Sequence, residues 1–228
     1  MNPISHIFFD AGNTLVYVNM DEVSRALARR GVRLSARELW QAEHAIRPLI
    51  DDPDLIRRSD DDSRWRLYFE RFLGRAGAPV DGVLDPVLAE LKTYHDAHNL
   101  WEVVPPEVPF LLERLRGRYR LGVISNSNGT VREKLRRVGL LPYFDLVLDS
   151  KEEGLEKPDP RIFRAALERL GARPGRSVHV GDFYHIDVVG ARAAGMRAVL
   201  LDPAGVHGDK FVPRLASLQD FPNVLRTL

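Results

Sequence analysis

The sequence contains no cysteine, which excludes disulfide bonds, thiolate metal ligands and a cysteine nucleophile. It has almost no net charge: 33 basic against 32 acidic residues give +1 at pH 7, with no basic stripe, which disfavours a nucleic-acid partner. No apolar run approaches ~18 residues, and no basic segment followed by an apolar one opens the chain, so neither a membrane span nor a secretory signal is expected. These absences predict a cytoplasmic protein with no membrane partner.

Lysine is also scarce, with five residues in a chain of 228 in which arginine supplies most of the positive charge. Each lysine can therefore be considered individually. The hydrophobic fraction of 44% is ordinary for a globular protein. A chain of this length can bury a sizeable core, in one domain or in a domain with an insertion.

Strands and helices alternate from Pro105 onward, with glycines between them. The pattern predicts helices at 108–116, 130–138, 160–170 and 187–194, and strands at 144–148, 177–180 and 198–201. Two further apolar strands are expected at 7–9 and 121–124. Buried strands that alternate with helices indicate a parallel sheet covered on both faces. The fold class is therefore α/β, of the Rossmann-like type.

Polar residues stand where these strands end: Asp10, Ser125, Asp149, Asp182 and Asp202. Right-handed crossovers would place all five strand ends on one edge of the sheet. Ligands bind at that edge in open α/β folds. We therefore expect the functional site there.

Residues 17–98 differ from this regular pattern and read as helices at 21–30, 35–46, 64–73 and 84–97. Aromatic residues recur along these helices and are expected to form a separate small core. We predict a core domain of residues 1–16 and 99–228, with 17–98 inserted as a strand-free, all-helical cap that acts as a lid.

Four motifs fall at the carboxyl edge: FFDAGNTL (8–15), VISNSN (123–128), EKPDP (156–160) and HVGDFYHIDVVGARAAG (179–195). In this order the motifs resemble the haloacid dehalogenase (HAD) superfamily of hydrolases with a helical C1-type cap. The resemblance covers the whole chain.

The resemblance implies a role for each motif residue. Asp10 would attack phosphorus and form an aspartyl-phosphate, Ser125 would hydrogen-bond a phosphoryl oxygen, and Lys157 would neutralise charge and orient Asp10. The neighbouring residues predicted to bind substrate are Asn126, Asn13 and Thr14. His179, in a predicted buried strand, is interpreted as a core histidine.

The resemblance also implies Mg²⁺ as cofactor. Asp10 and Asp182 would bind the ion directly, Gly12 would offer its main-chain carbonyl, and Asp187 would support the site through water or Lys157. Crowded carboxylates repel one another unless a hard cation or a lysine joins them, which favours the same arrangement.

Gly12 departs from the family pattern, because HAD phosphatases usually carry at that position an aspartate that acts as general acid and base. Its absence should remove a contribution of ~10²–10⁴-fold in rate. The favoured interpretation is a Mg²⁺-dependent phosphatase of a small phosphorylated metabolite, weak on alkyl phosphates and better on aryl or acyl phosphates.

Other activities remain open. A metal-independent 2-haloacid dehalogenase would also lack the second aspartate, although it would not need the pair Gly181-Asp182. A low-turnover phosphate- and metal-binding regulatory protein is the third possibility. Phosphonoacetaldehyde hydrolases use a lid lysine, and Lys92, the sole lysine in the insertion, matches poorly. The sequence specifies neither the substrate nor the oligomeric state.

Overall fold

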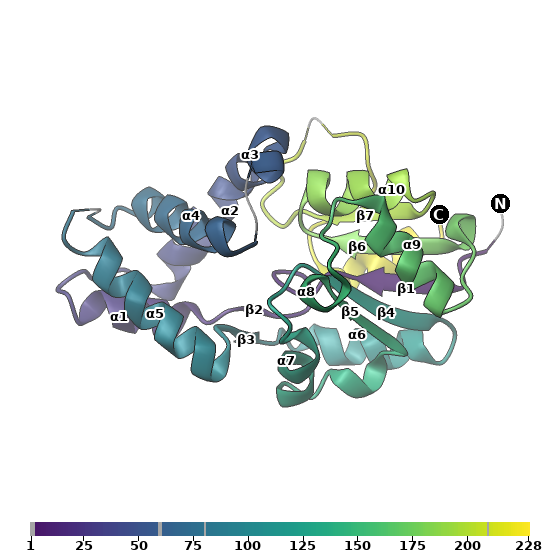
Figure 1. Ribbon diagram of the computed structural model, residues 1–228, viewed down its shortest axis with the longest axis horizontal. Helices are drawn as coiled ribbons and strands as arrows, with labels where there is room; N and C mark the ends of the chain where they lie inside the picture. Colours follow the sequence, from purple (N-terminus) through teal and green to yellow (C-terminus); the bar gives the residue numbers. More distant parts are fainter. Residues whose placement is uncertain (1–2, 59–60, 80, 209) are drawn as a thin grey trace. The chain divides into compact units, whose positions relative to one another are not determined.

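The computed structural model describes residues 3–58, 61–79, 81–208 and 210–228 (Figure 1). Its internal contacts divide the chain into two compact units, Met1–Tyr17 with Val104–Leu228, and Val18–Val103. The sequence placed the two boundaries after residues 16 and 98. Each unit is described by itself below.

In the first unit, the described residues form a six-stranded sheet in the order β5-β4-β1-β6-β7-β8. Every neighbouring pair of strands runs parallel. The bounds are β1 (His6–Phe9), β4 (Arg120–Ser125), β5 (Leu146–Asp149), β6 (Ser177–Gly181), β7 (Arg197–Leu201) and β8 (Arg214–Leu215). The predicted α/β fold with a parallel Rossmann-like sheet is confirmed. The two-residue strand β8 was not predicted.

Helices cover both faces of this sheet (Figure 1). Phe8 and Phe9 are successive residues of β1, so their side chains point to opposite faces. Phe8 belongs to a buried cluster that includes Phe163, whereas Phe9 packs edge-on against Phe144 and Phe221. The central strands are therefore buried on both sides, which explains why their sequences are continuously apolar.

Four helices of the first unit occupy predicted connections: α6 (Glu107–Arg116), α7 (Val131–Arg137), α9 (Pro160–Arg169) and α10 (Gly190–Ala193). The short helices α8 (Ser150–Glu153) and α11 (Phe221–Leu225) were not predicted. Asp159 caps α9 and Pro160 is its first residue, as the sequence predicted. The helix predicted at 187–194 instead begins as a π-helix, Tyr184–Val189, that leads into α10.

The second unit contains α1 (Met20–Ala28), α2 (Ala36–Ile50), α3 (Pro53–Arg58), α4 (Asp61–Arg75) and α5 (Leu84–His98). The short α3 was not predicted. Phe69 and Phe72 of α4 are fully buried, and their rings contact each other, Tyr68 and Trp101. The predicted aromatic core of the insertion is confirmed.

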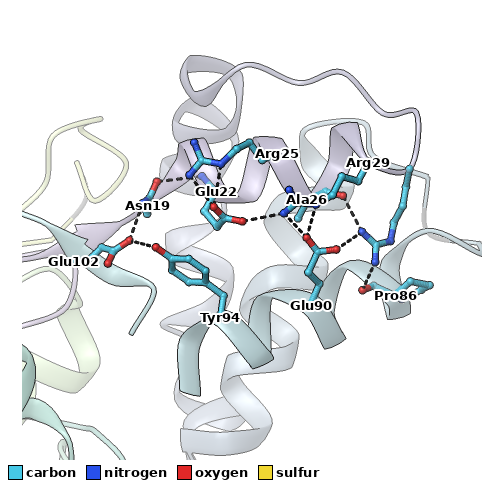
Figure 2. Close-up of polar contacts among 10 residues, drawn as sticks. Asn19, Glu22, Arg25, Ala26, Arg29, Pro86, Glu90, Tyr94 and Glu102 are labelled. Carbon is cyan, nitrogen blue, oxygen red and sulfur yellow. Dashed lines mark hydrogen bonds and ion pairs between the residues drawn. The ribbon is translucent and has the colours of Figure 1, made fainter. Parts of the chain in front are cut away.

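Two short strands were not predicted. β2 (Tyr17–Val18), at the start of the predicted insertion, and β3 (Trp101–Val103), just after its end, pair with each other. Asn19 joins the same two segments, since its main-chain N–H donates to Leu100 and its side-chain amide donates to Glu102 at 2.7 Å (Figure 2). Strands of two and three residues are too short to show a sequence period.

Polar contacts also join α1 to α5 within the second unit (Figure 2). Glu90 of α5 accepts hydrogen bonds from the guanidinium groups of Arg29 and Arg30. Tyr94 donates to Glu102 at 2.6 Å, and this hydrogen bond raises the pKa of Tyr94 to about 12. Over the described ranges, no helix is long and apolar enough to cross a membrane.

Candidate active site

Three neighbouring strands end in polar residues, as the sequence predicted. Asp10 follows β1, Ser125 is the last residue of β4, and Asp182 follows β6, and these side chains are all buried. The main-chain N–H of Asp10 donates to Val180 of β6 at 2.8 Å, so the turn after β1 is fixed to the neighbouring strand. Parallel pairing therefore places these groups at one edge of the sheet.

Lys157 joins two of the predicted acids. Its buried ammonium donates to Asp10 Oδ1 at 2.6 Å and to Asp187 Oδ1 at 2.7 Å. These residues are 147 and 30 positions away in the sequence, so only the fold brings the three groups together. One positive charge lies between two carboxylates, in a place that solvent hardly reaches.

The three groups differ in their tendency to ionise. Burial raises the pKa of Asp10 to about 6, although the Lys157 charge opposes the rise. Burial would raise the pKa of Asp187 too, but Lys157 and His179 outweigh it and hold this pKa well below its usual range. For Lys157, burial is outweighed by Asp10 and Asp187, which raise its pKa. The lysine is therefore charged at neutral pH and pairs with both carboxylates.

Asp187 reaches this position because Gly181 has no side chain. A Cβ atom on Gly181 would lie 2.2 Å from the Asp187 Cγ, so the Asp187 carboxylate could not keep its present position beside it. Oδ2 of Asp187 accepts a hydrogen bond from the Phe183 N–H at 3.1 Å, and Oδ1 faces both Lys157 and His179. The carboxylate is thus held by several donors.

His179 was interpreted from sequence only as a core histidine. It is fully buried, and its Nε2 lies 2.9 Å from Asp187 Oδ1. The sequence shows that His179 lies in a buried strand, but its contact with Asp187 has no local signal, because it depends on how the chain turns after Gly181.

Asn126 was predicted to bind substrate, and the structure places its side chain on the main chain of Lys157. Asn126 Oδ1 accepts from the Lys157 N–H at 2.8 Å, and Asn126 Nδ2 donates to the Lys157 carbonyl at 2.9 Å. The amide therefore fixes the backbone from which the lysine extends.

Ser125 lies beside Asn126, and its hydroxyl makes only a long, 3.4 Å contact with the Asn126 carbonyl. The loop that follows is held by Asp149, which accepts hydrogen bonds from Gly129 and Val131. Asp202 similarly accepts from the N–H groups of the loop after β7. Two of the five strand-end residues thus have structural roles that explain their positions.

Asn13 and Thr14 lie in the turn after β1. Asn13 has a φ of 53°, in the left-handed region that asparagine tolerates, and its N–H donates to Val16 at 2.7 Å. The turn also bridges Gly12 and Val16. Thr14 is fully buried, and its hydroxyl has no hydrogen-bond partner within the part of the chain that the structure describes.

The donors predicted for a cation are all oxygens: the carboxylates of Asp10 and Asp182 and the carbonyl of Gly12. Hard oxygen donors of this kind suit Mg²⁺, which binds few protein ligands and keeps several waters. Asp187 is already engaged by Lys157 and His179. Among the described residues, no group of three His, Cys, Asp or Glu side chains could hold a metal ion.

The first unit thus combines a parallel Rossmann-like sheet with a buried lysine that lies between two carboxylates. Residues 4–195 match the family model of haloacid dehalogenase-like hydrolases. The chain belongs to this family, as its motifs predicted.

Individual relatives agree with this assignment. A glyceraldehyde 3-phosphate phosphatase of Methanopyrus kandleri is 30% identical over 203 residues, which are 86% of this chain and 83% of that protein. The protein of the same name in Methanothermobacter thermautotrophicus is 40% identical over 139 residues, but the match spans only 61% of its length. The crystal structure of a 2-haloacid dehalogenase from Pseudomonas syringae pv. Tomato has a TM-score of 0.61 at 29% identity, covering 98% of this chain and 99% of that one.

Proposed function

We propose that this hydrolase is a Mg²⁺-dependent phosphatase of a small phosphorylated metabolite, with Asp10 as the nucleophile. The observation that carries the proposal is the Lys157 ammonium, buried between Asp10 and Asp187 at 2.6 and 2.7 Å. A phosphoryl group carries negative charge on its oxygens, and the attacking carboxylate is also negative. A lysine in contact with the nucleophile offsets the charge of both groups. Two relatives named as phosphatases of a triose phosphate support the same activity.

In this mechanism Asp10 attacks phosphorus, and the bond to the leaving oxygen breaks to give an aspartyl-phosphate. Lys157 holds one Asp10 oxygen and stabilises the negative charge, while the Ser125 hydroxyl donates a hydrogen bond to a phosphoryl oxygen. Mg²⁺, held by Asp10, Asp182 and the Gly12 carbonyl, would supply further positive charge. Water then hydrolyses the acyl phosphate and regenerates Asp10.

Gly12 cannot protonate a leaving group or activate this water. Substrates whose leaving groups need no proton, such as aryl and acyl phosphates, should therefore react faster than alkyl phosphates. We further propose that the helical insertion, predicted as residues 17–98, acts as the cap that selects the substrate, and that Asn13 and Thr14 help to shape the substrate-binding loop.

The proposal is tested by phosphate release from p-nitrophenyl phosphate, acetyl phosphate and glyceraldehyde 3-phosphate, each with Mg²⁺ and with EDTA. We expect release that requires Mg²⁺ and that disappears in Asp10→Asn. Release that persists in EDTA, or in Asp10→Asn, would contradict the mechanism.

A second candidate is a 2-haloacid dehalogenase, favoured by Gly12 and by the likeness to the Pseudomonas syringae enzyme. In that reaction Asp10 would displace halide from carbon without a metal. Halide release from 2-chloropropionate in EDTA, without phosphatase activity, would select this function. Binding of Mg²⁺ and of a phosphate analogue without turnover would instead support a regulatory protein.

A further inference from the structure

His179 contacts the active site from inside the protein core. Its side chain has no exposed surface and lies on the same face of β6 as Gly181, against which the Asp187 carboxylate folds. His179 Nε2 and Lys157 Nζ approach the same oxygen, Asp187 Oδ1, at 2.9 and 2.7 Å. One carboxylate oxygen thus connects a core residue to the lysine.

The direction of the hydrogen bond follows from the chemistry of the two partners. Asp187 is ionised, so it can only accept, and Nε2 of His179 must carry the proton. Burial lowers the pKa of His179 and keeps the ring neutral, which leaves Nδ1 without a proton. This Nδ1 atom is buried and has no hydrogen-bond partner among the described residues, as a neutral Nε2–H tautomer allows. The Phe163 ring packs edge-on against the imidazole, 5.1 Å away.

We propose that His179 is a positioning residue for the active-site lysine. Its Nε2–H fixes the Asp187 carboxylate, which in turn holds the Lys157 ammonium on Asp10. An aspartate side chain can rotate about two bonds, so the orientation of Oδ1 depends on its donors. Without His179, Oδ1 keeps only one of its two side-chain donors, and Lys157 shifts relative to Asp10. This inference rests on the proposed function in so far as Asp10 is the nucleophile.

A histidine that merely filled the core would be replaceable by any side chain of similar size. The test therefore compares His179→Gln, whose amide can donate a hydrogen bond, with His179→Met, which has similar bulk and no donor. Steady-state kinetics are measured on p-nitrophenyl phosphate with Mg²⁺, at a temperature where circular dichroism shows all variants folded. Phe163→Leu is the matched control, because it loosens the packing around His179 and removes no hydrogen bond.

We expect His179→Met to lower kcat by about 10- to 100-fold, as for a misplaced catalytic group, with little change in KM. His179→Gln should recover most of this loss, and Phe163→Leu should lose thermal stability but retain kcat. A wild-type kcat in His179→Met, or an equal loss in the Gln and Met variants, would overturn the proposal.

A second measurement does not depend on turnover. Urea unfolding in EDTA of His179→Met, Lys157→Met and the double variant gives a double-mutant cycle. Coupling between these residues is expected because both act on one Asp187 oxygen, and additive effects would overturn the proposal. If Lys157→Met does not fold, a crystal structure of His179→Met replaces the cycle. A displaced Lys157 ammonium would support the proposal, and an unchanged Lys157–Asp10 contact would overturn it. Wild-type protein that releases no phosphate would refute the phosphatase activity alone.

Discussion

The Asn126 side chain and the Lys157 main chain hold each other by two hydrogen bonds, of 2.8 and 2.9 Å. The bonds connect the loop after β4 to the segment before α9, 31 residues further along the chain. The lysine is therefore fixed at both ends: Asn126 holds its backbone, while Asp10 and Asp187 hold its ammonium.

Removing the Asn126 amide should release the backbone end of this lysine. We expect Asn126→Ala to lower the free energy of unfolding by about 1–3 kcal/mol, since it leaves polar groups of the Lys157 peptide unpaired. It should also lower kcat, because the lysine loses its placement. Asn128→Ala is the control, an exposed asparagine in the same loop that bonds Thr130 instead. Equal kinetics in the two variants would refute the role of Asn126.

Neutralising Asp10 and neutralising Asp187, the two carboxylates that contact Lys157, should change the stability of the protein in opposite directions. The folded-state pKa of Asp10, about 6, exceeds its ordinary value of 3.8. The negative charge of Asp10 therefore opposes folding, and this effect is complete above about pH 6. Asp10→Asn should therefore raise the Tm at neutral pH in EDTA. The gain should shrink as the pH falls from about 6 to about 4, and it should be absent below about 4, where the wild-type carboxyl is protonated in both states.

Asp187 has the reverse sign, because its folded-state pKa is depressed below 3.8. Its stabilising contribution is complete above that ordinary value and is lost as the pH falls toward the folded-state pKa. Asp187→Asn should lower the free energy of unfolding by about 3–5 kcal/mol at neutral pH, as expected when a buried ion pair loses one partner. Thermal unfolding in EDTA across the acid range measures both variants. Shifts of the same sign at neutral pH would contradict the opposite pKa shifts of Asp10 and Asp187.

Much of the fold could be predicted from sequence because the strands of the first unit are apolar runs that end at polar residues. Asp10, Ser125 and Asp182 were identified from those strand ends. The short strands β2 and β8 could not be predicted, since two residues give no periodicity. The π-helix also lacks a local signal, since its Asp187 is held by Lys157, 30 residues earlier, and by His179, 8 residues earlier and in a different element.

The active-site contacts were predictable to different degrees. The motifs gave Asp10 and Lys157 as partners, but they gave Asn126 a substrate-binding role, because no sequence pattern shows that its amide meets the Lys157 backbone. His179 was assigned to the core for a similar reason. Its residue type and its buried strand were evident, and its partner Asp187 depended on how the chain turns after Gly181.

Gly181 is the residue that makes room for this turn. A Cβ at this position would collide with the Asp187 side chain at 2.2 Å, so Gly181→Ala must displace the carboxylate that holds Lys157. We expect a loss of about 1–3 kcal/mol in stability, as for overpacking, together with a marked fall in kcat. Gly175→Ala is the control, because no described atom lies within 4 Å of a Cβ there. Urea unfolding and p-nitrophenyl phosphate kinetics on both variants check this, and an active, stable Gly181→Ala would contradict it.

Gly12 lies in the turn directly after Asp10, the proposed nucleophile, where it bridges to Val16. Gly12→Asp would place a carboxyl group two residues after Asp10, able to protonate a leaving group and then to activate water. Phosphatase turnover should rise toward the ~10²-fold that general acid–base catalysis typically gives, more for an alkyl phosphate than for acetyl phosphate. Gly12→Asn is the matched control, since its amide has the same shape and transfers no proton. If both variants gain equally, the effect comes from the backbone of the turn. If neither gains while both remain folded, another group already supplies the proton.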